Sequence, residues 1–210
     1  MIYSLDEAVA MLSSRHSSKR RAAAKFLRHV REVAAGPVLL QALEREIADP
    51  RTWETQYQLI MALAECGYIE ALPSLRLLST KHHNSLMIYT ALGDSIVRLG
   101  RQHANDVGPV LDLLGSGNLH LLEGAFRAMA MLRMIVSETA IRQIIDFAEK
   151  IPLVEAIDHG LWFWLVVASA GWKTSPTEKF LKKCSELKRK DISNAALCAL
   201  KGEYLACNPL

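Results

Sequence analysis

The sequence has 210 residues, of which 50% are hydrophobic and 7% aromatic, and it carries a formal net charge of +3. That hydrophobic content is ample for a continuous core, and the scarcity of aromatic residues and glycines favours helices over strands. The composition therefore predicts an all-α globular chain.

The four cysteines show no CxxC motif and no disulfide-framework spacing, which indicates reduced thiols in an intracellular protein. The first ten residues place two acids where a signal peptide has a basic region. The most apolar run, residues 161–171, is too short to span a bilayer. We therefore expect a cytoplasmic protein with no membrane partner.

Capping residues, prolines and glycines predict twelve helices with short connections. The first helix begins with a capping box over Ser4 to Glu7, and Ser137 caps a later one. The helices are expected at about 4–13, 17–36, 37–49 and 51–66, then a short and a long helix within 69–100, then 105–114, 119–134, 138–151, 153–171, a helix from 175 and a helix from 191.

Prolines and glycines mark a repeat. Pro37, Pro73 and Pro109 lie 36 residues apart, and proline is tolerated in the first turn of a helix, where its missing N–H has no partner to lose. Gly67 and Gly100, 33 residues apart, are expected to end two helices in the left-handed conformation. Periods of this size are typical of solenoid proteins.

The repeats share a Pro-x-Leu-x-Leu-Leu first helix, seen at Pro73–Leu78 and Pro109–Leu114, and one second helix ends in the segment Ala62–Gly67, ALAECG. With these residues the chain resembles HEAT and HEAT-like (phycobilisome-lyase type) repeats, most clearly over residues 36–134. The resemblance implies a right-handed α-solenoid of about six antiparallel helix pairs, whose second helices line a concave binding surface. The repeats are expected at about 4–35, 36–68, 69–101, 104–135, 137–172 and 175–206, within one domain.

The polar face of the second helices is the predicted binding surface. Positions spaced 4, 3 and 4 share one helix face, and the polar set recurs every 33 residues through four repeats. The alternative is that these are ordinary solvated helix faces. The residues predicted to bind are Arg21, Lys25, Arg28, Gln58, Met61, Glu65, Asp94, Arg98, Arg127, His159 and Trp162.

Charge is unevenly distributed along the chain. Residues 1–40 carry seven basic and three acidic groups, residues 41–160 carry ten and fifteen, and residues 161–210 carry eight and four. The basic ends can serve phosphate or an acidic protein partner. The alternative, favoured for the C-terminal end, is that they keep the terminal repeats soluble.

Enzymatic motifs are scarce in the sequence. The seven histidines are scattered, and His82 and His83 are adjacent in a predicted turn, where their side chains diverge, so no metal and no cofactor are expected. No His-Glu dipeptide occurs, which argues against the HEAT-repeat enzyme deoxyhypusine hydroxylase. The sequence also has no GxSxG motif and no glycine-rich phosphate loop.

One enzymatic alternative stays open, because alkylpurine DNA glycosylases are also HEAT-like solenoids. They use a basic groove, an aspartate and tryptophans, and this chain has Asp158 four residues before Trp162, with Trp164 and Trp172 nearby. Against this, the acidic middle of the chain would repel phosphate, and aromatic residues at this density are usually core.

A protein-binding scaffold or regulatory subunit is therefore the predicted function, with a helix or extended segment of another protein as its partner. Mixed charges with methionines such as Met61 suit a protein surface better than a polyanion. Arg98 and Arg127 are the expected anchors, and their replacement by Glu is expected to abolish capture without changing stability. Nucleic acid is the alternative partner, for which Arg21, Lys25 and Arg28 matter more.

Overall fold

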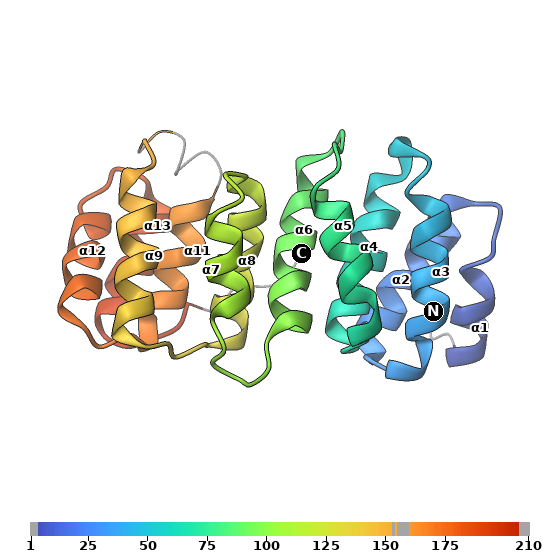
Figure 1. The fold of residues 1–210 in the computed structure, drawn as a ribbon, viewed down its shortest axis with the longest axis horizontal. Helices are drawn as coiled ribbons and strands as arrows, with labels where there is room; N and C mark the ends of the chain where they lie inside the picture. The colour runs from blue at the N-terminus through green and yellow to red at the C-terminus, as the bar shows by residue number, and fades with distance from the viewer. Residues whose placement is uncertain (1–3, 153, 155–159, 206–210) are drawn as a thin grey trace. The chain divides into compact units, whose positions relative to one another are not determined.

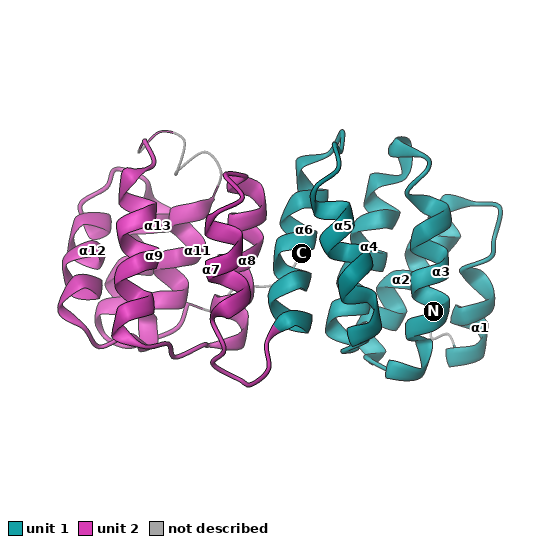
Figure 2. Ribbon diagram, viewed as in Figure 1, with its two compact units in different colours: residues 1–100 teal, residues 101–210 magenta. Residues whose placement is uncertain are grey.

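A computed structural model describes residues 4–152, 154 and 160–205 of the chain, and within these ranges it contains twelve α-helices and no strand. The predicted all-α fold is confirmed. The chain divides into two units of consecutive residues, unit 1 over 1–100 and unit 2 over 101–210 (Figure 2).

Unit 1 is built from three consecutive helix pairs, in which α1 contacts α2, α3 contacts α4 and α5 contacts α6 (Figure 1). The second helices form a row of their own, because α4 packs on both α2 and α6. The helices are α1 Leu5–Met11, α2 Ser17–Val30, α3 Gly36–Glu46, α4 Trp53–Glu65, α5 Leu72–Ser79 and α6 Leu86–Gly100, with 3-10 turns η1 Val33–Ala35, η2 Pro50–Thr52 and η3 Ile69–Ala71.

Unit 2 has two helix layers. In one layer α11 packs on both α8 and α13, and in the other α9 contacts both α7 and α12. The elements are α7 Gly108–Leu114, α8 Leu119–Leu132, α9 Glu138–Lys150, α11 Leu161–Ala168, α12 Ser175–Ser185 and α13 Lys190–Leu200, with the 3-10 turn η4 Ser169–Gly171.

Five of the predicted start signals are confirmed. Pro37, Pro73 and Pro109 all lie in the first turn of a helix, in α3, α5 and α7. Ser4 forms the expected capping box with Glu7, and the Ser137 side chain caps α9 by accepting a hydrogen bond from the Ala140 amide. These local signals position the first helix of each pair.

Two positions of unit 1 that lie 36 residues apart share a left-handed backbone conformation. Gly67, after α4, has a φ of 77°, and Arg31, 36 residues earlier and after α2, has a φ of 59°. A 3-10 turn follows each of them and leads into the next first helix. An arginine therefore adopts the left-handed conformation that glycine adopts one repeat later.

Several predicted helix ends are wrong. The helix expected to run to about residue 36 ends at Val30, because Arg31 turns the chain. Gly100 is the last residue of α6 and does not take a positive φ. The helix expected from residue 105 begins at Gly108, whose amide donates a hydrogen bond of 2.9 Å to the Asp106 carboxylate.

The helix expected at about 153–171 is not continuous. Gly160 interrupts it with a φ of 65°, α11 begins at Leu161, and a 3-10 turn replaces its last residues after Ala168. Residues 153 and 155–159 lie outside the described part of the chain, and Asp158 and His159 are among them.

Candidate functional site

Ion pairs connect α2 and α4 across the face that was predicted to bind. Arg21 pairs with Glu54, its counterpart 33 residues later, and both side chains are about half exposed. Further along the same helices, Arg28 Nε lies 2.8 Å from Glu65 Oε1, and Arg31 Nη2 lies 3.2 Å from Glu65 Oε2. Arg21 and Glu54 follow the predicted 33-residue offset, whereas Arg28 and Glu65 lie 37 residues apart, and in both cases the charges pair within the chain.

The pair between Arg28 and Glu65 is largely buried. Arg28 is 8% exposed, and the Glu65 side chain is 10% exposed. Arg28 also donates to Gln58 Oε1 at 3.3 Å, and its guanidinium lies 5.9 Å from the centre of the Tyr57 ring. The expectation that Arg28 is open to a partner is wrong, because its donors are held by α4.

Met61 and Trp162 are core residues. Met61 is 0% exposed because α4 is packed between α2 and α6. Trp162 in α11 is 1% exposed, donates from Nε1 to the Ala148 carbonyl at 3.3 Å, and meets the Phe180 ring edge-on at 5.2 Å between centroids. Their predicted place on an open surface is wrong in both cases.

The expected anchors are not exposed arginines either. Arg98 in α6 forms an ion pair with Asp94, one turn earlier in the same helix, and its side chain is 15% exposed. Asp94 is 0% exposed, and Arg127 in α8 is 4% exposed. Replacing Arg98 or Arg127 by Glu would therefore change stability as well as surface, contrary to the expectation. The remaining predicted residue, His159, lies outside the described residues.

Lys25 is the predicted site residue that the structure leaves open. It is exposed on α2 between Arg21 and Arg28, and it has no ion pair within the ranges that the structure describes. The 33-residue offset that joins Arg21 to Glu54 puts Lys25 across from Gln58, which is half-buried. This face, formed by Arg21, Lys25, Glu54 and Gln58, is referred to below as the α2–α4 face.

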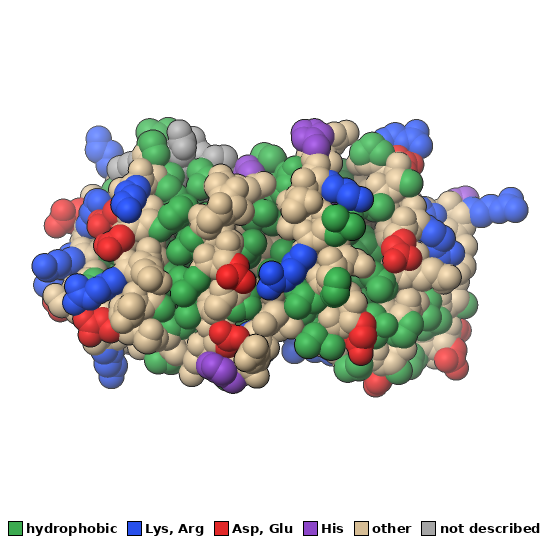
Figure 3. All heavy atoms as spheres, viewed as in Figure 1, with side chains coloured by type: hydrophobic (Ala, Val, Ile, Leu, Met, Phe, Trp, Pro, Cys, Tyr) green, Lys and Arg blue, Asp and Glu red, His purple; other side chains and the backbone are tan. Residues whose placement is uncertain are grey.

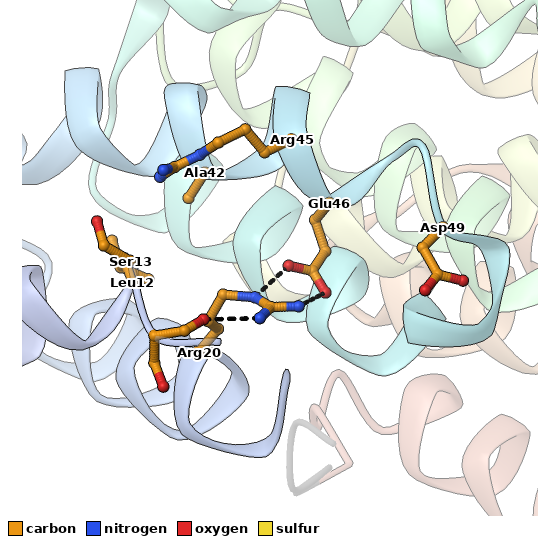
Figure 4. A pocket seen from close by; sticks show the side chains of 8 residues that line it. Leu12, Ser13, Arg20, Ala42, Arg45, Glu46 and Asp49 are labelled. Carbon is orange, nitrogen blue, oxygen red and sulfur yellow. Dashed lines mark hydrogen bonds and ion pairs between the residues drawn. The ribbon is translucent and has the colours of Figure 1, made fainter. Parts of the chain in front are cut away.

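A polar pocket of about 220 Å³ lies nearby in unit 1, between the loop after α1 and helix α3 (Figure 4). In it, Arg20 Nε and Nη2 donate to the two oxygens of Glu46 at 2.5 and 2.7 Å, and Nη1 donates to the Ser14 carbonyl at 2.8 Å. The hydrogen bonds to Glu46 raise the pKa of Arg20. The pocket is lined by Leu12, Ser13, Ser14, Arg20, Ala42, Arg45, Glu46 and Asp49.

The pair of Arg20 and Glu46 holds helices together. Glu46 is 5% exposed and also accepts from the Ser17 hydroxyl at 3.3 Å, while Ser17 and Thr55 share a hydrogen bond of 2.8 Å. The ion pair thus connects α2 to α3, and Ser17 extends the hydrogen bonds to Thr55 on α4. This ion pair was not predicted from the sequence. The signal for it is the charge distribution, since a basic start and an acidic middle of the chain favour ion pairs between α2 and the helices that follow it.

The described residues contain no group of three or more His, Cys, Asp or Glu side chains placed to hold a metal ion. None of the described helices is long and apolar enough to cross a membrane. Comparison with known proteins gave no matching family model, no matching curated protein and no matching solved structure.

Proposed function

We propose that this protein is a non-catalytic, protein-binding scaffold of the HEAT-like solenoid type, and that its α2–α4 face holds a helix or extended segment of another protein. The observation that carries the proposal is the position of Lys25, an exposed cation without an ion pair in the described residues, between two ion pairs that join its helix to α4.

The ion pairs prepare this face for binding. Arg28 is held by Glu65 and Gln58, so α2 and α4 present their exposed groups at a fixed spacing. A partner then orders few additional side chains, which lowers the entropic cost of association. Lys25 supplies donors for a carboxylate or carbonyl, and Glu54 supplies an acceptor, so the face favours a polar, mixed-charge protein segment.

Protein is favoured over nucleic acid because most of the basic residues of α2 are already neutralised. Arg20, Arg21 and Arg28 each face a glutamate of α3 or α4. Nucleic-acid binding gains much of its free energy when Lys and Arg side chains neutralise phosphates and release the counterions bound to them. Arginines that are already paired with glutamates contribute little to this release.

The buried tryptophans do not favour the glycosylase alternative. Trp172 is 4% exposed and donates from Nε1 to the Met134 carbonyl at 2.8 Å, as Trp162 does to that of Ala148. Both indole N–H groups are satisfied inside unit 2, and both rings are enclosed, so neither is presented to a nucleotide.

The proposal is tested by affinity capture from native cell extract with and without nuclease, using tagged wild type, Lys25→Glu and Lys188→Glu. Lys188 is also exposed and has no ion pair in the described residues, so the control makes the same charge change in unit 2, in the loop between α12 and α13. We expect to capture a specific protein whose recovery is unchanged by nuclease and by Lys188→Glu. Its recovery should fall about tenfold with Lys25→Glu. Equal recovery by both variants, or loss on nuclease treatment, would contradict the proposal.

A further inference from the structure

Exposed aliphatic side chains lie on the 3-10 turns η1 and η3 and on helix α5 of unit 1. Val33 is 52% exposed, Ile69 is 58% and Leu77 is 60%. Figure 3 shows hydrophobic side chains gathered over α3 and α5, with acidic side chains among them and at their edge. Large aliphatic groups gathered in the open on one face mark an interaction surface more often than isolated ones do.

The repeat explains why these side chains gather. Val33 and Ile69 occupy the same position in successive 3-10 turns, four residues before Pro37 and Pro73. Leu77 follows Pro73 by four residues, so both lie on one face of α5.

Tyr68 connects the starts of the two helices. Its ring lies so close to Gly36, the first residue of α3, that a β-carbon at position 36 would be only 2.2 Å from it. The 3-10 turn that carries Ile69 is thereby held against the start of α3, close to the turn that carries Val33. The outer patch defined by Val33, Pro37, Ile69, Pro73 and Leu77 is therefore one surface.

Carboxylates accompany the outer patch. Glu32, Glu44 and Glu70 are exposed, and none of them has an ion pair in the described part of the chain. Glu32 accepts a hydrogen bond only from the Ala34 amide. Of the two cations on these helices, Arg45 donates to the Gln41 carbonyl, and Arg76 lies beside Leu77. The exposed Arg31 beside Glu32 is paired with Glu65, so the three glutamates are the carboxylates on these elements that a partner's cations can pair with.

We propose that the outer patch is a second interaction surface, separate from the α2–α4 face, and that it binds a basic amphipathic helix of another protein. Aliphatic groups of that helix cover Ile69 and Leu77, and its lysines or arginines pair with the free glutamates. At 1.5 Å per residue the eight steps from Ile69 to Leu77 span about 12 Å, which two to three turns of a partner helix cover.

The charges select this partner over a second copy of the chain. A two-fold contact would bring the same patch of each copy together, so the glutamates of both copies would share one interface without a basic segment to pair with them. Like charges brought together in this way oppose association, whereas a basic segment satisfies them.

The test uses a fluorescein-labelled 14-residue helical peptide of leucine and lysine, with leucines along one face, and a matched peptide with glutamate in place of lysine. Binding by anisotropy is compared for wild type, Leu77→Ser, the double variant Glu44→Lys/Glu70→Lys, and the control Leu197→Ser. Leu197 is 50% exposed on α13 in unit 2, so the control removes a comparable side chain from elsewhere. Circular dichroism checks that each variant is folded.

We expect the lysine peptide to bind wild type and Leu197→Ser equally, and to bind Leu77→Ser and the double variant about tenfold more weakly. Lys25→Glu should bind it as wild type does, which separates this surface from the α2–α4 face. The inference is overturned by equal binding of the glutamate peptide, by unchanged affinity of Leu77→Ser, or by self-association of wild type that Leu77→Ser abolishes.

Discussion

Each unit has a central helix that packs on two others, α4 on α2 and α6 in unit 1 and α11 on α8 and α13 in unit 2, but these contacts differ in chemistry. In unit 1, α2 is joined to α4 by charged pairs, of which Arg28 with Glu65 is the most buried. In unit 2, the corresponding central helix α11 reads LWFWLVVA and carries no charge. It is held by packing and by the indole of Trp162, which donates to the Ala148 carbonyl.

This difference predicts which substitutions change stability alone and which also change binding. Charged pairs fix the register of α2 against α4, because a shift of either helix would leave buried charges unpaired. The apolar side chains of α11 stabilise unit 2 through burial and place no charged group on the surface. We therefore expect changes in unit 1 to alter both stability and recognition, and core changes in unit 2 to alter stability alone.

The largest expected effect is at the centre of unit 2. Trp162→Ala removes a 1% exposed indole and its contact with Phe180, and should cost about 3 to 5 kcal/mol of unfolding free energy. Denaturant unfolding measures it, with Trp53→Ala, at a 38% exposed position, as the control. A loss below about 1 kcal/mol would show that α11 is not a core helix.

The second-largest loss of stability is expected at the central ion pair of unit 1. Arg28→Ala leaves the 10% exposed Glu65 with Arg31 alone, and should cost about 2 to 3 kcal/mol in the same measurement. Replacing both partners, as Arg28→Met with Glu65→Leu, should recover most of that loss, because no buried charge is then unpaired. If the double variant were no more stable than Arg28→Ala, pairing would not explain the effect.

Two glycines in the same local sequence, GPVL, give a matched comparison between the units. Gly36→Ala places a β-carbon 2.2 Å from the Tyr68 ring and should cost about 1 to 3 kcal/mol through overpacking. At Gly108 the nearest atom is the Asp106 carboxylate at 3.1 Å, so Gly108→Ala should cost less. Thermal melting compares them, and equal losses would argue against a special close approach in unit 1.

A smaller, pH-dependent effect is expected at Asp49 in unit 1. Hydrogen bonds from Arg51 lower the pKa of this carboxyl from 3.8 to about 2. Because the folded-state pKa is the lower one, its contribution to stability is present above pH 4 and is lost as the pH falls through about 2. Asp49→Asn should therefore melt below wild type at neutral pH and converge with it in acid. A difference that is constant with pH would contradict this.

The smallest effect should come from the exposed pairs of unit 2. Arg142 and Glu138, one turn apart on α9, are both more than half exposed. Arg142→Ala should cost only about 0.3 to 0.5 kcal/mol and should lose its effect at high salt. A loss as large as that of Arg28→Ala would remove the contrast between the units.

Local signals made much of the fold predictable. Pro37, Pro73 and Pro109 mark the first turns of α3, α5 and α7, and Ser4 and Ser137 cap the helices that they were expected to cap. Each of these signals acts within one helical turn, so the sequence displays it directly. The end of α2 could not be read this way, because Arg31 takes a conformation that usually indicates glycine.

The site was less predictable because burial depends on neighbouring helices. On its own helix Arg28 lies on the polar face, and only the carboxylate of Glu65, 37 residues later, shows that it is buried. Met61 lies on the same predicted face but is enclosed between α2 and α6. Opposite charges at a 33-residue offset, as at Arg21 and Glu54, are the signal that could have separated paired residues from free ones.

The central claim, that the α2–α4 face holds another protein, is tested most directly by site-specific photo-crosslinking in native cells. A photoreactive amino acid is placed at Lys25 or at Gln58, with position 188 as the control. We predict that positions 25 and 58 yield the same crosslinked protein and that position 188 does not. Crosslinks to nucleic acid, or the same products from all three positions, would contradict the account.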